Sequence, residues 1–498
     1  MNPIDALIAF VAPERGVRRI LARDAIRSLA ETRAYAAAGQ GRRNKGWRAR
    51  PTSSNAEIGA SLNNLRNRSR EYVRDSWAGQ RILDVMVSHV VGTGIVPAVE
   101  TGSDRANKKF SLAWEEWSAA ADIEGVLDFG GQQSLGVRSM IEGGDTVLRY
   151  HDITMNEAGR TVPFRLQGLE GDQIDTSRDA QLADQNVRLG VKLGANGRRL
   201  GLYLHEDHPG EMTLKGTSYS SNLVAWNDLS HLYRPLRWGQ VRGASWFAPI
   251  LLTAKEIQDL TDAAIVKARV EACFAAFRKN AATGASPFAA KTDENGDKVT
   301  RIEPGMIFDI GDSDIVFAQP SSQSSFAEVY IAGMQAMAAG IGMTYDQLTG
   351  DLRQANYSSM RAGRIEFRRL VEQIQWHIVI PRLCIPVLNR FVARAVLSGI
   401  LPDRREGYPV KWITPANEPI DPKKDLEADI LAVRSGRLSP QEFISAWGRD
   451  WRAVVADYAL FLKAIDDAGV PLDIDPRKPA NGLAAPAPGD QTKGNQDG

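Results

Sequence analysis

The histidines and clustered acids of this chain decide which chemistry it could perform. His205 and His208 are its closest pair of histidines, and they flank Glu206 and Asp207 just before Pro209. A zinc site of the H-E-x-x-H type needs two histidines one turn apart on a helix. The closer i, i+3 spacing at the end of an expected strand lacks that arrangement, so we expect no metal at this pair.

Three nearby acids form a second group. Glu170, Asp172 and Asp175 could contribute carboxylates to a metal-dependent hydrolase, and sequence spacing does not exclude that site. Acids in turns and at strand edges more commonly accept hydrogen bonds from local backbone donors, and we interpret these three in that way. We therefore expect no catalytic residue, no cofactor and no metal.

Two phosphate-binding motifs are incomplete or missing. Gly92-Thr-Gly94 follows an apolar run and begins like a dinucleotide fingerprint, but Pro97 stands where the third glycine should open a helix. The sequence contains no G-x-x-x-x-G-K-[ST] motif. We therefore expect no ATP hydrolysis through a phosphate-binding loop of that type.

Basic residues are concentrated at the N-terminus. Residues 1–75 carry 15 Lys or Arg against 7 Asp or Glu, and the run before Pro51 holds five of them within nine positions. Trp47 is nearly the only aromatic residue there, so a solvated, partly disordered extension is favoured over a nucleic-acid site with stacking aromatics. The whole chain has 61 Lys and Arg against 60 Asp and Glu, so any DNA contact must be loose or local.

A helix, a polar loop and a second helix stand out between residues 326 and 378. Val329–Tyr345 is uncharged and has apolar residues at helical spacing, but its glycines and the missing Trp, Tyr, Lys and Arg flanks argue against a membrane span. Small residues there suit close helix contact between subunits. The polar segment 346–357 follows, and Ser358 or Ser359 should cap the next helix.

That second helix should present Arg361, Arg364 and Arg368 on one stripe opposite its apolar face. Three arginines in line could face phosphates. They could equally form a salt-bridged solvent face with Glu366 and Glu372. The residues alone leave both interpretations open.

The remaining patterns indicate an α+β chain of about three domains. Hydrophobic residues make up 43% and charged residues 24%, as in globular proteins, and Cys273 and Cys384 should be buried, unpaired thiols of a cytoplasmic protein. The expected elements are a mixed body over 76–240 with a Trp-bearing helix near 110–117, a helix over 249–280, a small β insertion with strands at 306–310 and 314–318, a strand at 410–413, helices at 423–435 and 440–468, and a disordered tail from 471.

Six separated stretches follow the order found in a known family. They are VVGTGIVP at 90–97, WEEW at 114–117, LEGDQID at 169–175, RWGQVRGASWFAP at 237–249, AAGIGMTYDQLTGDLRQANYSSMRAGRIEFRR at 338–369 and IDPKKDLEADILAVRSGRLSPQEFISAWGRD at 420–450. With these motifs the chain resembles the portal proteins of lambda-like tailed bacteriophages over about residues 60–455. The family often has a proline where Ser245 stands.

The resemblance implies a portal fold and a division of the chain. The implied parts are a basic arm (1–59), an α+β wing (60–249), a first stem helix (250–280), a clip (281–321), a second stem helix (322–344), a tunnel loop (345–357), a channel-backing helix with a return to the wing (358–419), crown helices (420–470) and a disordered tail (471–498). The tunnel loop would place Asp351, Leu352, Arg353, Gln354 and Asn356 at the DNA channel, with Leu352, Arg353 and Gln354 as the constriction.

The resemblance also implies the partners. Such proteins form a dodecameric ring at one capsid vertex, through which the terminase motor drives double-stranded DNA, and they have no catalytic site. Partners would be the terminase large subunit, the major capsid or scaffold protein and a head-tail adaptor, with no membrane. The protein would assemble in the host cytoplasm and end in the virion.

Two other functions stay open on the residues alone. A nucleic-acid-processing hydrolase would show metal-dependent cleavage that substitution of Asp172 or Glu170 abolishes. A basic-arm nucleic-acid binder would stay small and lose affinity when residues 1–50 are removed.

Overall fold

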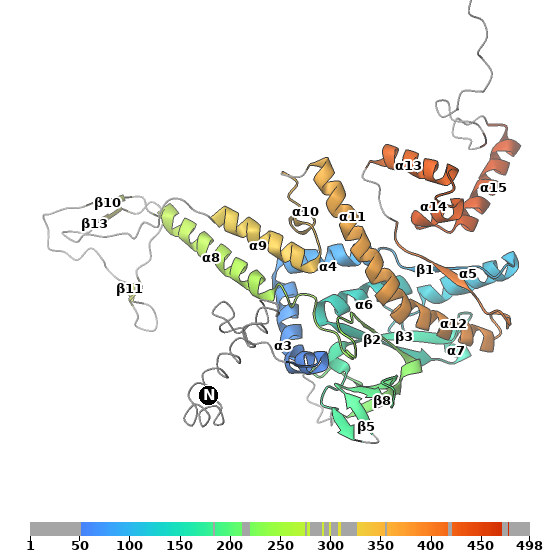
Figure 1. Cartoon of the computed structure of the whole chain (residues 1–498), viewed down its shortest axis with the longest axis horizontal. Helices are drawn as coiled ribbons and strands as arrows, with labels where there is room; N and C mark the ends of the chain where they lie inside the picture. The colour runs from blue at the N-terminus through green and yellow to red at the C-terminus, as the bar shows by residue number, and fades with distance from the viewer. Residues whose placement is uncertain are drawn as a thin grey trace, which may run out of the picture. The chain divides into compact units, whose positions relative to one another are not determined.

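A computed structural model of the chain describes residues 51–182, 185–211, 220–273, 276–278, 291–292, 298–299, 307–309, 326–353, 356–416, 421–470 and 477. The chain divides into two units, Met1–Ser53 and Ser54–Gly498. The predicted basic arm and the predicted disordered tail lie almost wholly outside the described residues. The following account concerns the second unit, which Figure 1 shows coloured by residue number.

Helices pack on a three-stranded antiparallel sheet of order β3-β2-β9. The sheet strands are β2 (Asp145–Asp152), β3 (Phe164–Glu170) and β9 (Leu229–Tyr233), and the helices that lie against them or against one another are α3 (Ser54–Asp75), α4 (Trp77–Val90), α5 (Asp104–Ala119) and α6 (Phe129–Gly143). Aromatic rings fill the core. Trp114 and Trp117 of α5 contact Phe129, and Trp117 stacks on Phe164 at 5.5 Å. The predicted Trp-bearing helix is therefore confirmed as a core element.

A second sheet of five antiparallel strands, in the order β4-β5-β6-β7-β8, encloses a smaller core. Its strands are β4 (Ala180–Leu182), β5 (Gln185–Arg188), β6 (Val191–Leu193), β7 (Arg199–His205) and β8 (Ser221–Ala225). The turn Gly194-Ala-Asn-Gly197 joins β6 to β7, and Gly197 takes φ +72 there, a conformation that favours glycine. Short helical segments complete this region: α7 (Met155–Ala158), η3 (Gly171–Gln173) and η4 (Trp226–Asp228).

A buried charge cluster joins these layers. Asp145 at the start of β2 accepts hydrogen bonds from Arg66 of α3 at 3.0 Å and from Arg242 at 2.5 Å, and His231 Nε2 lies 3.3 Å from it. All four side chains are 1% exposed or less. Burial alone would raise the pKa of Asp145, but the two guanidinium groups and His231 outweigh it and hold that pKa far below its ordinary value.

Glycines let the segment that carries Arg242 approach β2. A Cβ placed on Gly243 would lie 1.8 Å from the carbonyl oxygen of Gly144, and Gly144 itself has φ +98. Ser245 donates a hydrogen bond to Ser69 Oγ at 2.8 Å and accepts one from Phe247 N at 3.1 Å. These contacts fix the chain before α8.

Two long helices, α8 (Leu251–Cys273) and α9 (Phe326–Ile341), lie side by side (Figure 1). The small residues of α9 serve this contact, because a Cβ on Gly333 would meet Ile257 and one on Gly340 would meet Ile250. The prediction that these glycines contact another subunit is therefore wrong for these two positions.

The predicted helix over 249–280 is too long. α8 ends at Cys273, and Ala276–Arg278 forms strand β10, which pairs in parallel with β13 (Ile307–Asp309). Pairing with a distant strand overrides the local helical pattern here. β13 confirms one of the two strands expected in the β insertion, and β11 (Lys291–Thr292) pairs with β12 (Lys298–Val299). The second expected strand, 314–318, lies outside the described residues.

After α9 comes a short helix, α10 (Tyr345–Thr349), and then one long helical path. The path consists of α11 (Tyr357–Ile374), a π-helical segment η5 (Gln375–Cys384) and α12 (Ile385–Leu397). Proline inside a helix ordinarily bends or ends it, and this path contains Pro381 and Pro386. Instead the helical path continues through both, because the wider turns of η5 accommodate Pro381 and Pro386 stands in the first turn of α12. Cys384 is buried and free, as expected.

The C-terminal part begins with β14 (Val410–Ile413), which pairs with β1 (Val96–Val99). Three helices follow, α13 (Pro422–Arg434), α14 (Pro440–Ala446) and α15 (Trp451–Ala468). The predicted helix over 440–468 is therefore two helices, separated at Gly448, which takes φ +71. None of α13, α14 and α15 has a buried residue.

Among the described residues, no helix combines the length and apolar character needed to cross a membrane. The mixture of helices and antiparallel sheets confirms the predicted α+β class.

Candidate functional site

The segment between α9 and α11 is more ordered than the polar loop that the sequence predicts. Thr344 caps α10 in a reciprocal capping box with Gln347, and Gly350 ends the helix with φ +71. Asn356, rather than Ser358 or Ser359, caps α11: its side chain accepts a hydrogen bond from Ser359 N at 2.8 Å, and Ser359 Oγ accepts one from Asn356 N at 3.2 Å. Between α10 and α11, the described residues outside a helix are 350–353 and 356.

Asp351 and Arg353 neutralise each other at the tip of this loop. The Arg353 guanidinium donates Nε to Asp351 Oδ1 at 2.9 Å and Nη2 to Oδ2 at 2.8 Å, and the Arg353 backbone N–H donates to Oδ1 at 3.1 Å. These hydrogen bonds lower the pKa of Asp351 to about 2. Arg353 nevertheless keeps its side chain 86% exposed. The tip is therefore exposed but close to neutral.

The other predicted loop residues differ in what they offer. Leu352 is 56% exposed and carries an apolar side chain at the tip. Asn356 is exposed, but its side chain is committed to capping α11. Gln354 lies outside the described residues. The loop thus presents Leu352 and the Asp351–Arg353 pair to solvent.

The three arginines of α11 do not form one free stripe. Arg361 Nη2 lies 3.3 Å from Asp425 Oδ1 and so ties α11 to α13. Arg364 and Arg368 line a cavity of about 510 Å³ beside the buried Phe367, at the edge of the apolar face rather than opposite it. Burial and, second, the neighbouring Arg364 lower the pKa of Arg368 below its ordinary value.

This cavity brings α4, α10 and α11 together. Arg81 of α4 donates Nε to the carbonyl oxygen of Gln347 at 3.0 Å, and His89 packs edge-on against Phe367 at 5.0 Å. Leu352 also lines it, so the exposed loop tip is continuous with a basic hollow. The sequence did not point to Arg81 or His89, because their contacts with α10 and α11 join positions more than 250 residues apart.

The acids considered for metal chemistry are held by arginines. Glu170, Asp172 and His208 lie close enough for one ligand atom from each to fall within 4.8 Å of the others. Arg70 contacts both carboxylates, at 2.6 Å for Asp172, and Arg66 lies 3.2 Å from Asp172. The guanidinium groups lower the pKa of Asp172 despite its burial. This donor set fits an arginine–carboxylate network better than a cation site.

Asp175 stands apart from that network. It accepts hydrogen bonds from Ser177 N at 3.1 Å and from the Ser177 and Ser221 hydroxyls, and His205 Nε2 lies 3.7 Å away. The prediction of local backbone contacts describes Asp175, whereas Glu170 and Asp172 pair with helix α3 instead. Asp172 and Asp175 line the same hollow of about 690 Å³, but arginines already hold the first carboxylate and serine hydroxyls the second.

Comparison with known proteins identifies the chain. The family "Phage portal protein, lambda family" matches residues 40–375, which include α3 to α11 and the whole segment between α9 and α11. The chain belongs to this family. The family match ends where η5 begins, so α12 to α15 lie beyond it.

Relatives of this portal family member are similar over most of their length. A probable portal protein of Halomonas phage phiHAP-1 is 23% identical over 481 residues, covering 92% of both chains. The portal protein of Escherichia phage N15 is 21% identical and covers 83% of this chain and 86% of its own. Portal protein B of Escherichia phage lambda is 23% identical over 55% of this chain and 57% of its own.

Solved structures of gene transfer agent (GTA) particles are also similar. A chain in the virion of a native GTA particle has 16% identity and a TM-score of 0.37, covering 79% of this chain and 92% of that one. A chain in the neck of a native GTA particle has 16% identity and a TM-score of 0.38, covering 78% and 93%.

Proposed function

We propose that this portal family member forms a closed dodecameric ring at one vertex of a phage capsid and conducts double-stranded DNA during packaging and ejection. Family membership over residues 40–375 carries this proposal. In this role the protein acts without catalysis or cofactor, and the motor is a separate terminase. The portal family member would assemble in the host cytoplasm and then remain in the virion.

Uncovered apolar faces support assembly with further copies. One stripe of α15 holds seven apolar residues, and none of them is buried: Trp451, Val454, Val455, Tyr458, Phe461, Leu462 and Ile465. Val455, Tyr458 and Phe461 are 52%, 49% and 43% exposed. A helix with an apolar stripe of this width ordinarily covers it with a neighbour.

The stem helices add to this surface. Leu252 and Val266 of α8 are 75% and 56% exposed, and Val329 of α9 is 49% exposed. Subunits of a ring contact two neighbours through two different faces, so exposed apolar groups on more than one element are what a ring subunit requires. A monomeric protein would gain nothing from leaving them in water.

We place the DNA-facing constriction at Leu352, Arg353 and Gln354. Duplex DNA carries one charge per roughly 1.7 Å, and each phosphate that a protein neutralises strengthens salt-dependent binding. An arginine already paired with Asp351 adds little net charge, so twelve such loops would guide DNA without holding it. Arg364 and Arg368 stand behind the tip and would supply weaker attraction.

The docking partners follow from the division of the chain. The segment 281–321 would bind the terminase large subunit and later the head-tail adaptor, and the α+β body would contact the major capsid or scaffold protein. The hydrolase alternative is less well supported, because arginines already occupy Glu170 and Asp172. A binder that acts through its basic arm remains testable by removing residues 1–50.

The loop assignment is tested by packaging. Deletion of Leu352–Gln354 should reduce the amount of DNA retained in filled heads, because the constriction widens. Replacement of the same three residues by serine keeps the loop length and separates the effect of length from that of side chains. Wild-type packaging and retention by the deletion variant would refute the constriction while leaving the ring untouched.

A further inference from the structure

A second hollow, far from the loop in sequence, gathers arginines. It has a volume of about 500 Å³ and lies where one end of the five-stranded sheet meets the segment after β9 and the π-helical segment η5. Arg188 of β5, Arg199 of β7 and Arg382 of η5 line it together with Tyr233, Trp238 and Gln240. We refer to it as the arginine pocket.

The charge of the arginine pocket is not balanced. No acidic residue is among those that line it. Within the described part of the chain, no carboxylate pairs with Arg188, Arg199 or Arg382. Arg237 also lines the pocket, but it pairs with Glu57 of α3 at 3.0 Å. Three guanidinium groups therefore share one hollow without a counter-charge.

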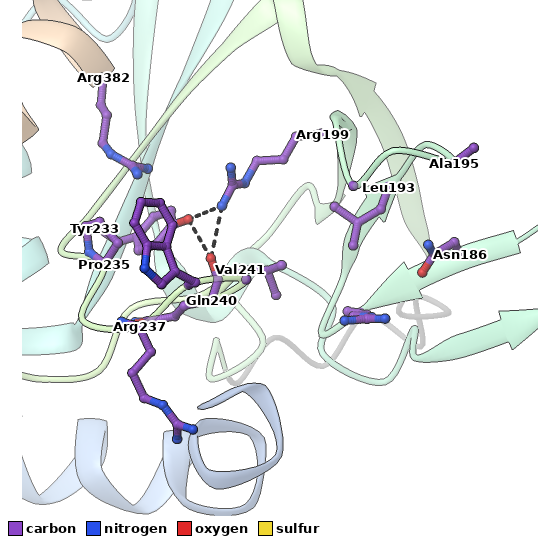
Figure 2. A pocket seen from close by; sticks show the side chains of 14 residues that line it. Asn186, Leu193, Ala195, Arg199, Tyr233, Pro235, Arg237, Gln240, Val241 and Arg382 are labelled. Carbon is purple, nitrogen blue, oxygen red and sulfur yellow. Dashed lines mark hydrogen bonds between the residues drawn. The ribbon is translucent and has the colours of Figure 1, made fainter. Parts of the chain in front are cut away.

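The protein holds these groups in place. Arg199 Nη2 donates to the Tyr233 hydroxyl and, at 3.0 Å, to the carbonyl oxygen of Gln240, while Tyr233 donates to the same oxygen at 2.9 Å. Arg382 lies over the Tyr233 ring at 4.3 Å. Figure 2 shows Arg199 and Arg382 converging on Tyr233 from different elements, with Arg237 extending away. The cations are thus oriented before any ligand arrives.

Hydrogen-bond capacity remains unused inside the pocket. The Nε atoms of Arg188 and Arg199 are buried and have no hydrogen-bond partner among the described residues. A buried guanidinium group without a counter-charge is costly, and an anion in the hollow lowers that cost by supplying the opposite charge. Guanidinium groups match carboxylate and phosphate oxygens through paired N–H donors.

The rim indicates what kind of molecule carries the anion. Trp238 is 103% exposed and Leu236 is 66% exposed, so two large apolar side chains stand in water on the segment beside the arginines. A phosphate backbone offers such side chains little to bury against. Trp and Arg together are typical of protein-binding hot spots. We infer that the arginine pocket binds an acidic segment of a protein partner, with carboxylates on the arginines and an apolar residue against Trp238.

A peptide of this chemistry tests the inference. The probe is a short fluorescein-labelled peptide in which Asp and Glu flank a central Leu, and its binding to the assembled protein is followed by fluorescence anisotropy. We expect saturable binding that the double variant Arg188→Gln/Arg382→Gln weakens about tenfold or more, as loss of charge-assisted hydrogen bonds requires. The variant Arg198→Gln removes an exposed arginine that does not line the pocket, and it should bind as wild type does.

Two further variants separate peptide binding at the pocket from a folding defect and from pairing with a nearby acid. Trp238→Ala changes a fully exposed side chain and should weaken peptide binding without affecting folding, so the test survives if the double variant does not fold. Asp184, the nearest acid in the sequence to Arg188, lies outside the described residues, and Asp184→Asn should leave affinity unchanged. Equal binding by the double variant and Arg198→Gln would overturn the inference. A gain of about tenfold in peptide affinity in the Asp184→Asn variant would also overturn it. So would a double variant that loses duplex DNA binding but keeps its affinity for the peptide.

Discussion

Asp145 shows how strongly single side chains determine this fold. It is fully buried and balances Arg66 and Arg242, which also donate to the carbonyl oxygens of Gly143, Gly171 and Leu189. The three charges come from α3, β2 and the segment after β9. The attraction between Asp145 and these two arginines, with Asp172 as the second carboxylate on Arg66, joins these elements at their centre.

Removing this counter-charge should be severe. Asp145→Asn leaves the buried Arg242 without a carboxylate and leaves Arg66 with Asp172 alone, at 3.2 Å, and we expect the free energy of unfolding to fall by about 3–5 kcal/mol. Urea unfolding followed by circular dichroism measures it. Asp84→Asn is the matched control, because Asp84 is 65% exposed and 3.3 Å from Arg138, where a loss below about 1 kcal/mol is expected. Similar losses in both variants would contradict the account.

His231 gives the cluster a pH dependence. Burial, only partly offset by Asp145, lowers its pKa from 6.5 to about 4. The unfolded chain therefore takes up a proton near pH 6.5 that the folded chain refuses until about pH 4, so stability is complete above this window and falls as the pH is lowered through it. We expect a loss of up to roughly 3 kcal/mol, measured by urea unfolding at several pH values.

A pair of histidine variants isolates this effect. His231→Gln should flatten the pH dependence between pH 6.5 and 4, whereas His377→Gln, at an exposed position, should keep it. The same slope in all three proteins would show that His231 does not carry the dependence. No sequence pattern predicted this cluster, because Arg66, Asp145 and Arg242 come together only when strands and helices distant in sequence pack against one another.

Among helices and strands, the close approach of β2 to the segment after β9 is the tightest constraint. A side chain at Gly243 would strike the backbone oxygen of Gly144, which cannot move aside as a flexible side chain would. Gly243→Ala should lower the free energy of unfolding by about 3 kcal/mol or more. Gly168→Ala, where an added Cβ meets nothing within 4 Å, should change it by less than about 1 kcal/mol.

Thermal unfolding of the two glycine variants decides this point. A Gly243→Ala protein as stable as Gly168→Ala would show that the two backbone segments separate easily, against the packing described above.

Local pattern predicted the elements better than their ends. The apolar periodicity of α9 and the Trp-bearing α5 were correct, because both helices bury one face in the core. The end of α8 and the helical path through Pro381 were not predicted, since the first depends on pairing with a distant strand and the second on turns wider than those of an α-helix. α10 was also missed, although the capping box of Thr344 and Gln347 is a local signal. In the site, the role of the loop at the channel stays a prediction, whereas the pairing of Arg361 with Asp425 and the cavity beside α4 require the tertiary structure.

As a subunit, the chain leaves its C-terminal helices without a core of their own. α13, α14 and α15 carry apolar side chains but bury none of them, although they follow a well-packed body. This contrast is the physical expectation for helices completed by neighbouring copies.

Charges on the α15 stripe should therefore block assembly. Val455→Asp/Phe461→Asp places carboxylates at the proposed contact, and we expect the fraction of protein in rings to fall at least about tenfold, since each buried charge costs several kcal/mol. Lys463→Glu changes charge on the opposite side of α15 and should assemble normally. Sedimentation velocity measures the ring fraction. Undiminished assembly of the double variant would exclude this stripe as a subunit contact.

The most direct test of the central claim is negative-stain electron microscopy of the purified chain, with subunits counted in end-on views. The account predicts closed, dodecameric rings around a central channel. A population consisting only of monomers or dimers would contradict it, and a metal-dependent nuclease assay with Asp172 and Glu170 variants would then be the next experiment.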